Sequence, residues 1–302
     1  MRGAELLDKI GLADPAYVAA AHAPPERGAI RRRGWQALAA CLALAVVSAA
    51  VLVQVHNRAA TLPKLEQVPV ISAAADLPGG MRRMMNYAGM RYVFLEGGAA
   101  YSLAPEQLGE AVGVLEYDIQ ADPEANGKKE FSATYALGGT VYLLADYDPA
   151  FRVAVEQDGL YFICQSVGYT QGGDIDPGEY FQKARFPKIV DGVSIYDHMG
   201  SELLGSVPAG SVDALVKCLS QAVPAELDSD GYQQIAQAQR EGLSYRLSFD
   251  LSDGTKYWLY VIPALDIAMI GDGRYTLPDT LSGQFGGLFD GLEQTPPSIG
   301  PP

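Results

Sequence analysis

The chain has 302 residues, 48% of them hydrophobic and 19% charged, and 36 acidic against 22 basic residues give it a net charge of −14. Residues 1–34 have a net charge of +2 and residues 56–302 a net charge of −16, with no charged residue between these segments. This distribution excludes nucleic acid as a partner of the larger segment, because contacts to phosphates need clustered Lys and Arg.

The N-terminal segment, residues 1–34, predicts two short helices. Asp14 is placed to cap the second helix, and Pro15 suits its first turn, where a missing N–H costs nothing. So short a segment cannot build a hydrophobic core, so we expect it to bind a partner or to lie on a membrane surface. The residues that would contact a cytoplasmic partner are Leu6, Leu7, Ile10, Tyr17 and Val18.

The uncharged stretch from Trp35 to Val53 predicts a membrane-spanning helix, assigned to residues 35–55. About 20 apolar residues in a helix cross the hydrocarbon core of a bilayer. A cleaved secretion signal has a shorter apolar run and a small-residue cleavage site after that run. A lipoprotein signal ending at Cys41 would need its apolar run before the cysteine, whereas here the run follows it. A permanent anchor is therefore the favoured interpretation of the three.

The orientation of this span follows from the basic residues beside it. Arg31, Arg32 and Arg33 precede the span directly, and basic residues are sparser after it. Because short segments rich in Lys and Arg stay cytoplasmic, we expect the N-terminus inside the cell and the C-terminal part outside. Trp35 is expected at the inner interface, where an indole ring can lie in the lipid boundary while its N–H stays hydrated.

The chain beyond the span predicts a linker, one large extracytoplasmic domain and a short tail. Three prolines and a Gly–Gly pair between positions 56 and 85 are typical of a linker or stalk. The predicted organisation is a linker over residues 56–85, a domain over 86–292 and a disordered tail over 293–302. A change of pattern near residue 170 allows two lobes in the domain, 86–169 and 170–292.

The large domain is predicted to be a β-rich α+β domain with mostly antiparallel strands and a few helices. Short apolar strands are separated by pairs such as Gly97–Gly98, Asp158–Gly159 and Asp253–Gly254, which supply the positive φ angles of tight hairpins. Residues 92–115 resemble residues 267–289, and we interpret both as a strand-turn-strand-helix unit. Two ordinary hairpins that each lead into a helix explain the similarity as well.

Few residues of this domain are placed for catalysis. His198 is its only histidine, and a serine or cysteine nucleophile needs a base. No catalytic motif accompanies His198, so we interpret it as a structural residue. Cys164 and Cys218 lie on the oxidising side, where a disulfide is allowed, but two buried thiols are the favoured interpretation.

One acidic loop, residues 226–237, partly resembles a calcium-binding loop. Glu226, Asp228, Asp230 and Gly231 match the spacing of the first half of such a loop, but Gln237 stands where a bidentate glutamate is needed. Helix capping by Asp228 or Asp230 is the better interpretation. We therefore predict no metal site, no cofactor and no catalytic residue.

Tyrosines are frequent on the predicted strands. On an exposed strand face they can bind peptide or glycan, but packing on a half-buried sheet is the more common role. The tyrosines in question are Tyr161, Tyr169, Tyr180, Tyr245, Tyr257 and Tyr260.

The first 55 residues resemble Gram-positive bacterial membrane proteins related to anti-sigma factors. The resemblance lies in the inside segment LLDKIGLADPAYVAAA, the basic stretch and GWQALAACLALAVV. It implies a sigma factor bound on the cytoplasmic side and an outside domain that senses an unknown ligand. The alternatives are an envelope-anchored binding or scaffolding domain without a cytoplasmic partner, and a hydrolase with an unrecognised site. We predict a single-pass protein of the cell membrane that binds rather than catalyses.

Overall fold

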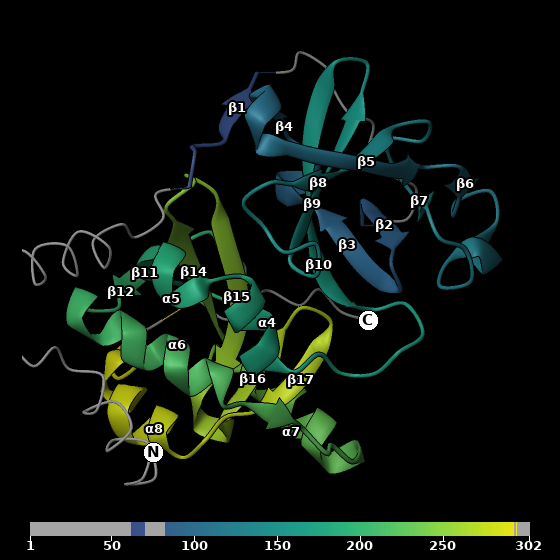
Figure 1. Cartoon of the computed structure of the whole chain (residues 1–302). Coiled ribbons are helices and arrows are strands. Elements are labelled where there is room, and N and C mark those ends of the chain that lie inside the picture. Colours follow the sequence, from purple (N-terminus) through teal and green to yellow (C-terminus); the bar gives the residue numbers. More distant parts are fainter. Residues whose placement is uncertain (1–61, 70–81, 293, 295–302) are drawn as a thin grey trace, which may run out of the picture. The chain divides into compact units, whose positions relative to one another are not determined.

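The computed structural model describes residues 62–69, 82–292 and 294, all within one compact unit, Ala60–Pro302 (Figure 1). These residues form two sheets, almost entirely antiparallel, and five α-helices, which confirms the predicted strand-rich α+β class. The predicted span, residues 35–55, lies outside the described residues. No helix in the described part is long and apolar enough to cross a bilayer.

Sheet A contains ten strands in the order β5-β8-β9-β10-β3-β2-β7-β6, with β4 paired to β10 and β1 paired to β4. All of its pairs are antiparallel except β6 with β7. The strands are β1 (Glu66–Val68), β2 (Met84–Tyr87), β3 (Met90–Phe94), β4 (Ala100–Ser102), β5 (Leu108–Val114), β6 (Tyr117–Asp118), β7 (Ser132–Ala133), β8 (Thr140–Leu144), β9 (Arg152–Gln157) and β10 (Leu160–Tyr169).

Sheet B contains seven antiparallel strands in the order β12-β11-β14-β15-β16-β17-β13. Its strands are β11 (Val190–Tyr196), β12 (Leu203–Ser206), β13 (Val223–Pro224), β14 (Tyr245–Leu251), β15 (Lys256–Ile262), β16 (Ile267–Ile270) and β17 (Gly273–Thr276). The helices are α4 (Pro177–Lys183), α5 (Phe186–Ile189), α6 (Val212–Ser220), α7 (Ser229–Arg240) and α8 (Thr280–Phe285).

Helices α4 and α6 cover one face of sheet B (Figure 1). Along α6, Val212, Leu215, Val216 and Leu219 are all buried, as their helical spacing predicts. On the opposite side of the sheet, Ile235 and Ala238 of α7 pack on Ile262 and Ile267. We call the whole of this side, including the part beyond α7, the open face.

An aromatic cluster makes the core continuous between the two sheets. The Phe186 ring centroid lies 4.9 Å from Tyr257 and 5.4 Å from Phe249 on sheet B, and 6.2 Å from Phe151 beside sheet A. All four side chains are at most 2% exposed, and burying one large apolar side chain contributes roughly 1.5–3 kcal/mol. The sheets are therefore held together by hydrophobic packing in addition to the polar contacts described below.

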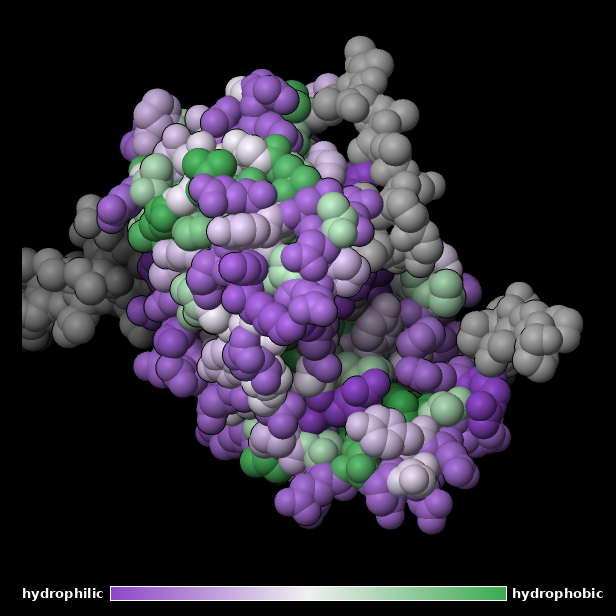
Figure 2. All heavy atoms as spheres, turned by 90° about the vertical axis from the view of Figure 1, so that its right-hand side faces the viewer, coloured by the Kyte–Doolittle hydropathy of each residue, from purple (hydrophilic) through white to green (hydrophobic). Residues whose placement is uncertain are grey.

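The face of the molecule that lies to the right in Figure 1 is mainly hydrophilic. On the face shown in Figure 2 hydrophobic residues occur in separate small groups among hydrophilic ones. This agrees with the acidic composition of the domain.

Two of the predicted hairpins are present in the structure, and the prediction of a third is wrong. The β9–β10 turn uses Asp158 (φ 53°) and Gly159 (φ 78°), both in the left-handed region that tight hairpins need. The β14–β15 turn contains Gly254, with φ 86°. The expected hairpin at Gly97–Gly98 does not form, because β3 and β4 both pair with β10 instead of with each other. The segment with Gly97 and Gly98 therefore connects two strands that lie one after the other along the same side of β10, and the chain does not reverse its direction there.

Three further expectations differ from the structure. After β4 the chain forms only a short 3-10 helix, Pro105–Gln107, before strand β5, so the first of the two similar units lacks an α-helix, whereas the second ends in α8. Part of the predicted linker is strand β1, which pairs with β4, and Leu62 and Leu65 beside it are buried. Gln294, in the tail predicted to be disordered, donates from its amide to the Ser244 carbonyl at 3.0 Å.

Candidate functional site

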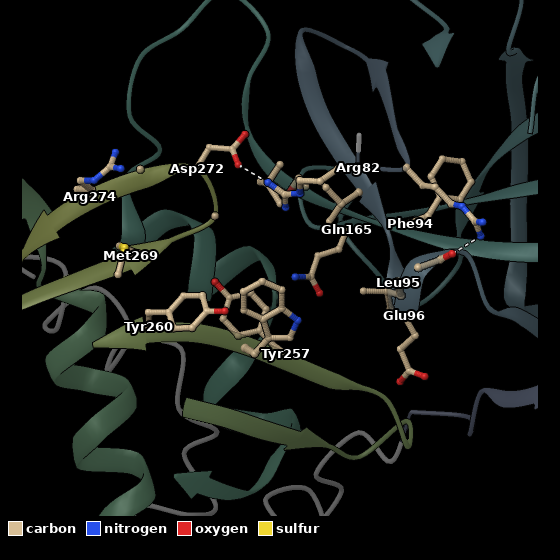
Figure 3. A pocket seen from close by; sticks show the side chains of 18 residues that line it. Arg82, Phe94, Leu95, Glu96, Gln165, Tyr257, Tyr260, Met269, Asp272 and Arg274 are labelled. Atoms are coloured by element: carbon tan, nitrogen blue, oxygen red, sulfur yellow. Dashed lines mark hydrogen bonds and ion pairs between the residues drawn. The ribbon is translucent and has the colours of Figure 1, made fainter. Parts of the chain in front are cut away.

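A cleft of about 990 Å³ lies where β3 and β10 of sheet A approach β15, β16 and β17 of sheet B (Figure 3). Phe94, Leu95 and Glu96 line it from sheet A. Trp258 and Tyr260 line it from the open face of sheet B. A cleft of this size, with apolar and polar groups in its walls, is the kind of cavity in which proteins hold small ligands or peptide segments.

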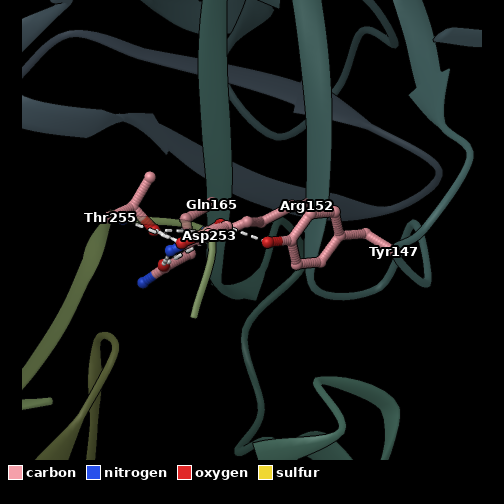
Figure 4. Close-up of polar contacts among 5 residues, drawn as sticks. All are labelled: Tyr147, Arg152, Gln165, Asp253 and Thr255. Carbon is pink, nitrogen blue, oxygen red and sulfur yellow. Dashed lines mark hydrogen bonds and ion pairs between the residues drawn. The ribbon is translucent and has the colours of Figure 1, made fainter. Parts of the chain in front are cut away.

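The first contact between the sheets is a buried ion pair, which we call the Asp253 junction (Figure 4). It consists of Tyr147, Arg152, Gln165, Asp253 and Thr255. Arg152 Nη1 donates to Asp253 Oδ2 at 2.9 Å, and both side chains are 0% exposed. The same nitrogen donates to Thr255 Oγ1 at 2.8 Å, while Nη2 donates to Gln165 Oε1 at 3.0 Å.

The carboxylate at this junction has partners on both of its oxygens. Asp253 Oδ1 accepts from the Thr255 N–H at 2.8 Å and from the Thr255 hydroxyl at 2.7 Å. The Tyr147 hydroxyl donates to Asp253 Oδ2, and burial raises the pKa of this tyrosine well above its usual range. A charge pair removed from water is tolerated only when its hydrogen bonds are satisfied, and this one meets that condition.

The second contact between the sheets, the Asp272 junction, is partly exposed. It consists of Arg82, Arg91, Val167, Gly271 and Asp272. The Asp272 N–H in the β16–β17 turn donates to the Val167 carbonyl of β10 at 2.8 Å. The Asp272 carboxylate accepts from Arg82 at 2.9 Å and from Arg91 at 3.3 Å. Gln165 of the first junction and Gly271 of the second both line the cleft, so both junctions fix the spacing of its walls.

The sheet B wall of the cleft combines aromatic rings with the guanidinium group of Arg274, and a second guanidinium group, that of Arg246, lies beside the wall. Exposed and buried residues alternate along β15, so Trp258 and Tyr260 share the open face, and Trp258 is 42% exposed. The Arg246 Cζ lies 4.7 Å from the Trp258 ring centroid, within the range of a cation–π contact. The His198 ring packs against Tyr260 with centroids 4.9 Å apart and the ring planes tilted by 36°.

The predicted interpretation of the tyrosines holds for some positions and not for others. Tyr180, Tyr245 and Tyr257 are buried in the core, as packing residues are. Tyr260 is half-buried and lines the cleft, which is the less common role. The sequence signal for this role is the alternation of polar and apolar residues around Trp258, because it places this tryptophan and Tyr260 on the same face of the strand.

His198 contacts a serine but does not present it as a nucleophile. The Ser244 Oγ lies 2.9 Å from His198 Nδ1, and Ser244 is 0% exposed. The neighbouring Asp197 carboxylate accepts from Ser201 and from the Glu202 N–H. In this arrangement the serine hydroxyl has no access to a substrate, and the carboxylate is used to hold a loop.

The stability that His198 contributes is expected to depend on pH. Burial lowers the pKa of His198 below its usual 6.5, against an opposing effect of Asp197. The unfolded chain therefore binds the proton more readily, so this contribution is complete above about pH 6.5 and is lost as the pH falls through the folded pKa. Urea unfolding of the wild type and of His198→Gln between pH 5 and 8 measures it. A difference between the two proteins that stays constant over this range would contradict the assignment.

The other candidate residues have structural roles. Cys164 and Cys218 are buried thiols that are not bonded to each other, as favoured, and burial raises the pKa of Cys164. Asp228 caps α7, accepting from the Gly231 N–H at 2.8 Å, which confirms the capping interpretation. Within the described ranges no group of three or more His, Cys, Asp or Glu side chains is arranged to hold a metal ion.

The residues predicted from the N-terminal part cannot be placed relative to this cleft. The positions that lie outside the described residues are Leu6, Leu7, Ile10, Tyr17, Val18, Arg31, Arg32, Arg33 and Trp35. Comparison of the chain with known protein families, with curated proteins and with solved structures finds no match.

Proposed function

We propose that the chain is a binding protein whose β-rich domain holds a ligand in the cleft between its two sheets. The observation that carries this proposal is the cleft wall formed by Trp258, Tyr260 and Arg274, with the guanidinium of Arg246 against Trp258 beside it. Tryptophan, tyrosine and arginine dominate binding hot spots, because they combine a large apolar surface with directed polar contacts. The Asp253 and Asp272 junctions support it, since walls fixed before binding lose less entropy when a ligand enters.

The same proposal includes a membrane anchor. Residues 35–55 would span the bilayer as one helix, with Arg31, Arg32 and Arg33 on the cytoplasmic side and the cleft outside. The protein would then sense or hold an extracytoplasmic ligand at the cell membrane. The acidic composition of residues 56–302 supports a domain that stays clear of anionic lipid.

The cytoplasmic end distinguishes two forms of this function. In an anti-sigma-like regulator, Leu6, Leu7 and Ile10 would contact a sigma factor, and ligand binding outside would change that contact. In an envelope-anchored binding or scaffolding protein, residues 1–34 would only orient the span. Specific recovery of a sigma factor on a peptide of residues 1–34, with no recovery on the alanine variant of these three residues, would identify the regulator.

Binding in the cleft is expected to change the fluorescence of Trp258. The chain has two tryptophans, so full-length protein carrying Trp35→Phe reports from Trp258 alone. Peptide and glycan fractions of a solubilised cell-wall digest are the probes. At least one fraction should shift the emission, and Tyr260→Ala should weaken its binding by a factor of roughly 30, as loss of a hot spot of about 2 kcal/mol does.

Tyr117→Ala is the matched control for this experiment. Tyr117 is 40% exposed on β6, away from the cleft lining, so its removal should leave the binding unchanged. Equal loss of binding in both tyrosine variants would contradict the cleft as the site. No emission change with any fraction would contradict the proposed function.

A further inference from the structure

Five residues follow one another across the open face of sheet B in a single row of cross-strand pairs. Tyr196 on β11 pairs with Arg246 on β14, which pairs with Tyr260 on β15. Tyr260 pairs with Met269 on β16, and Met269 pairs with Arg274 on β17. Side chains of directly paired residues stand on the same face of a sheet, and Figure 3 shows Tyr260, Met269 and Arg274 in succession. We call this set the arginine row.

The two arginines of the row have no carboxylate partner among the described residues. Arg246 lies over Trp258, and the Arg274 Cζ lies 5.3 Å from the Tyr232 ring centroid. By contrast, Arg82 and its neighbour at the Asp272 junction share a carboxylate. In a segment of net charge −16, two guanidinium groups without acidic partners are available to bind the carboxylates of another molecule. A guanidinium can donate two parallel hydrogen bonds to one carboxylate.

An apolar surface separates the two guanidinium groups. Tyr260 and Met269 occupy the row between them, and Trp258 lies diagonally beside Arg246. A methionine side chain is flexible and polarisable, so it adapts to apolar side chains of different shape. Neighbouring strands are about 4.8 Å apart, so the backbones of Arg246 and Arg274, three strands apart, are separated by roughly 14 Å.

This spacing equals the distance between residues i and i+4 of an extended peptide, at about 3.3–3.4 Å per residue. In such a peptide the side chains of i, i+2 and i+4 point to one side. An acidic residue at i, an apolar residue at i+2 and an acidic residue at i+4 would therefore meet one arginine, the apolar surface and the other arginine.

We propose that the arginine row binds an extended acidic peptide segment with an acidic–x–apolar–x–acidic pattern, lying across the strands of sheet B. This inference rests on the proposed binding function and names the ligand class of the same site, because Tyr260, Met269 and Arg274 of the row line the cleft and Arg246 lies against Trp258 at its margin. A peptide matches the row better than a sugar chain, because Met269 suits the variable apolar side chain of a peptide.

The test uses full-length Trp35→Phe protein and the synthetic peptide Ser-Glu-Ser-Leu-Ser-Glu-Ser, with Trp258 fluorescence as the readout. We expect saturable binding that weakens with added salt. Arg246→Gln and Arg274→Gln should each weaken it at least about tenfold, because each removes a charge-assisted contact. Arg240→Gln, an exposed arginine on α7, is the matched control and should bind normally. The peptide with both glutamates replaced by glutamine should not bind.

An oligouronate, an acidic sugar chain, is the second probe. Binding of the oligouronate without binding of the peptide would overturn the peptide assignment and leave the proposed cleft function standing. Peptide binding that is equal in the Arg246, Arg274 and Arg240 variants would overturn the role of the arginine row. If the peptide fails while a cell-wall fraction still shifts the emission, only this inference is overturned, and if nothing shifts it, both fail.

Discussion

Replacing Arg152 with methionine is expected to lower the free energy of unfolding by about 3–5 kcal/mol, the range measured when one partner of a buried ion pair is removed. The variant leaves the Asp253 carboxylate at 0% exposure without its guanidinium. Thr255 and Tyr147 still donate to it, but hydrogen bonds do not replace the lost positive charge. Urea unfolding of full-length protein in detergent, followed by Trp258 fluorescence in the Trp35→Phe background, measures the loss.

Two further variants make this result specific. Lys128→Met breaks an exposed ion pair with Glu124, four residues earlier in the chain, and exposed pairs of this kind contribute about 0.2–1 kcal/mol. The double variant Arg152→Met with Asp253→Leu should regain much of the loss, because apolar replacement of a whole buried pair is often neutral. If Arg152→Met costs no more than Lys128→Met, the Asp253 junction does not hold the sheets together.

The Arg152 result would also bear on the cleft. Gln165 receives two hydrogen bonds from Arg152 and lines the cleft at the same time. Loss of the guanidinium frees this amide to change its conformation. We therefore expect the cleft to become less ordered in Arg152→Met before the protein unfolds, and weaker binding in this variant would reflect lost preorganisation rather than a lost ligand contact.

Local chemistry explains which parts of the fold could be predicted. The turn at Asp158–Gly159 follows from the residues that tolerate positive φ, and the Asp228 cap follows from a side chain that can reach a free backbone N–H. The Gly97–Gly98 pair carries the same signal but does not form a hairpin. Its strands pair instead with β10, more than 50 residues later in the chain, and nothing in the local sequence states that partner.

The site divides in the same way. Strand alternation places Trp258 and Tyr260 on one face, so this aromatic part of the cleft wall could be predicted from the sequence. The Arg152–Asp253 pair could not be predicted, because a charged residue usually indicates a solvent-exposed position. In addition, the two partners are 101 positions apart in the chain. The two faces of the cleft come from different sheets, and their approach is determined by tertiary packing around Phe186 rather than by any local pattern.

Replacing Gly271 with alanine is the second change with a large expected effect. Gly271 has φ +59°, and a Cβ added there would lie 2.2 Å from the Val167 carbonyl oxygen. That oxygen belongs to the backbone of β10 and accepts the Asp272 N–H, so it cannot move without disturbing the Asp272 junction. Overpacking and the positive φ together should lower the free energy of unfolding by about 2–4 kcal/mol.

Gly172→Ala separates the two causes of this loss. Gly172 has φ +82° but no atom within 4 Å of an added Cβ, so only the backbone conformation is strained, at a cost of roughly 1 kcal/mol. The same unfolding measurement on both variants gives the contribution of the contact between the sheets as the difference. Acrylamide quenching of Trp258 should also rise in Gly271→Ala alone, because the cleft wall moves away from β10. Equal losses of stability and unchanged quenching would show that the β16–β17 turn does not determine the width of the cleft.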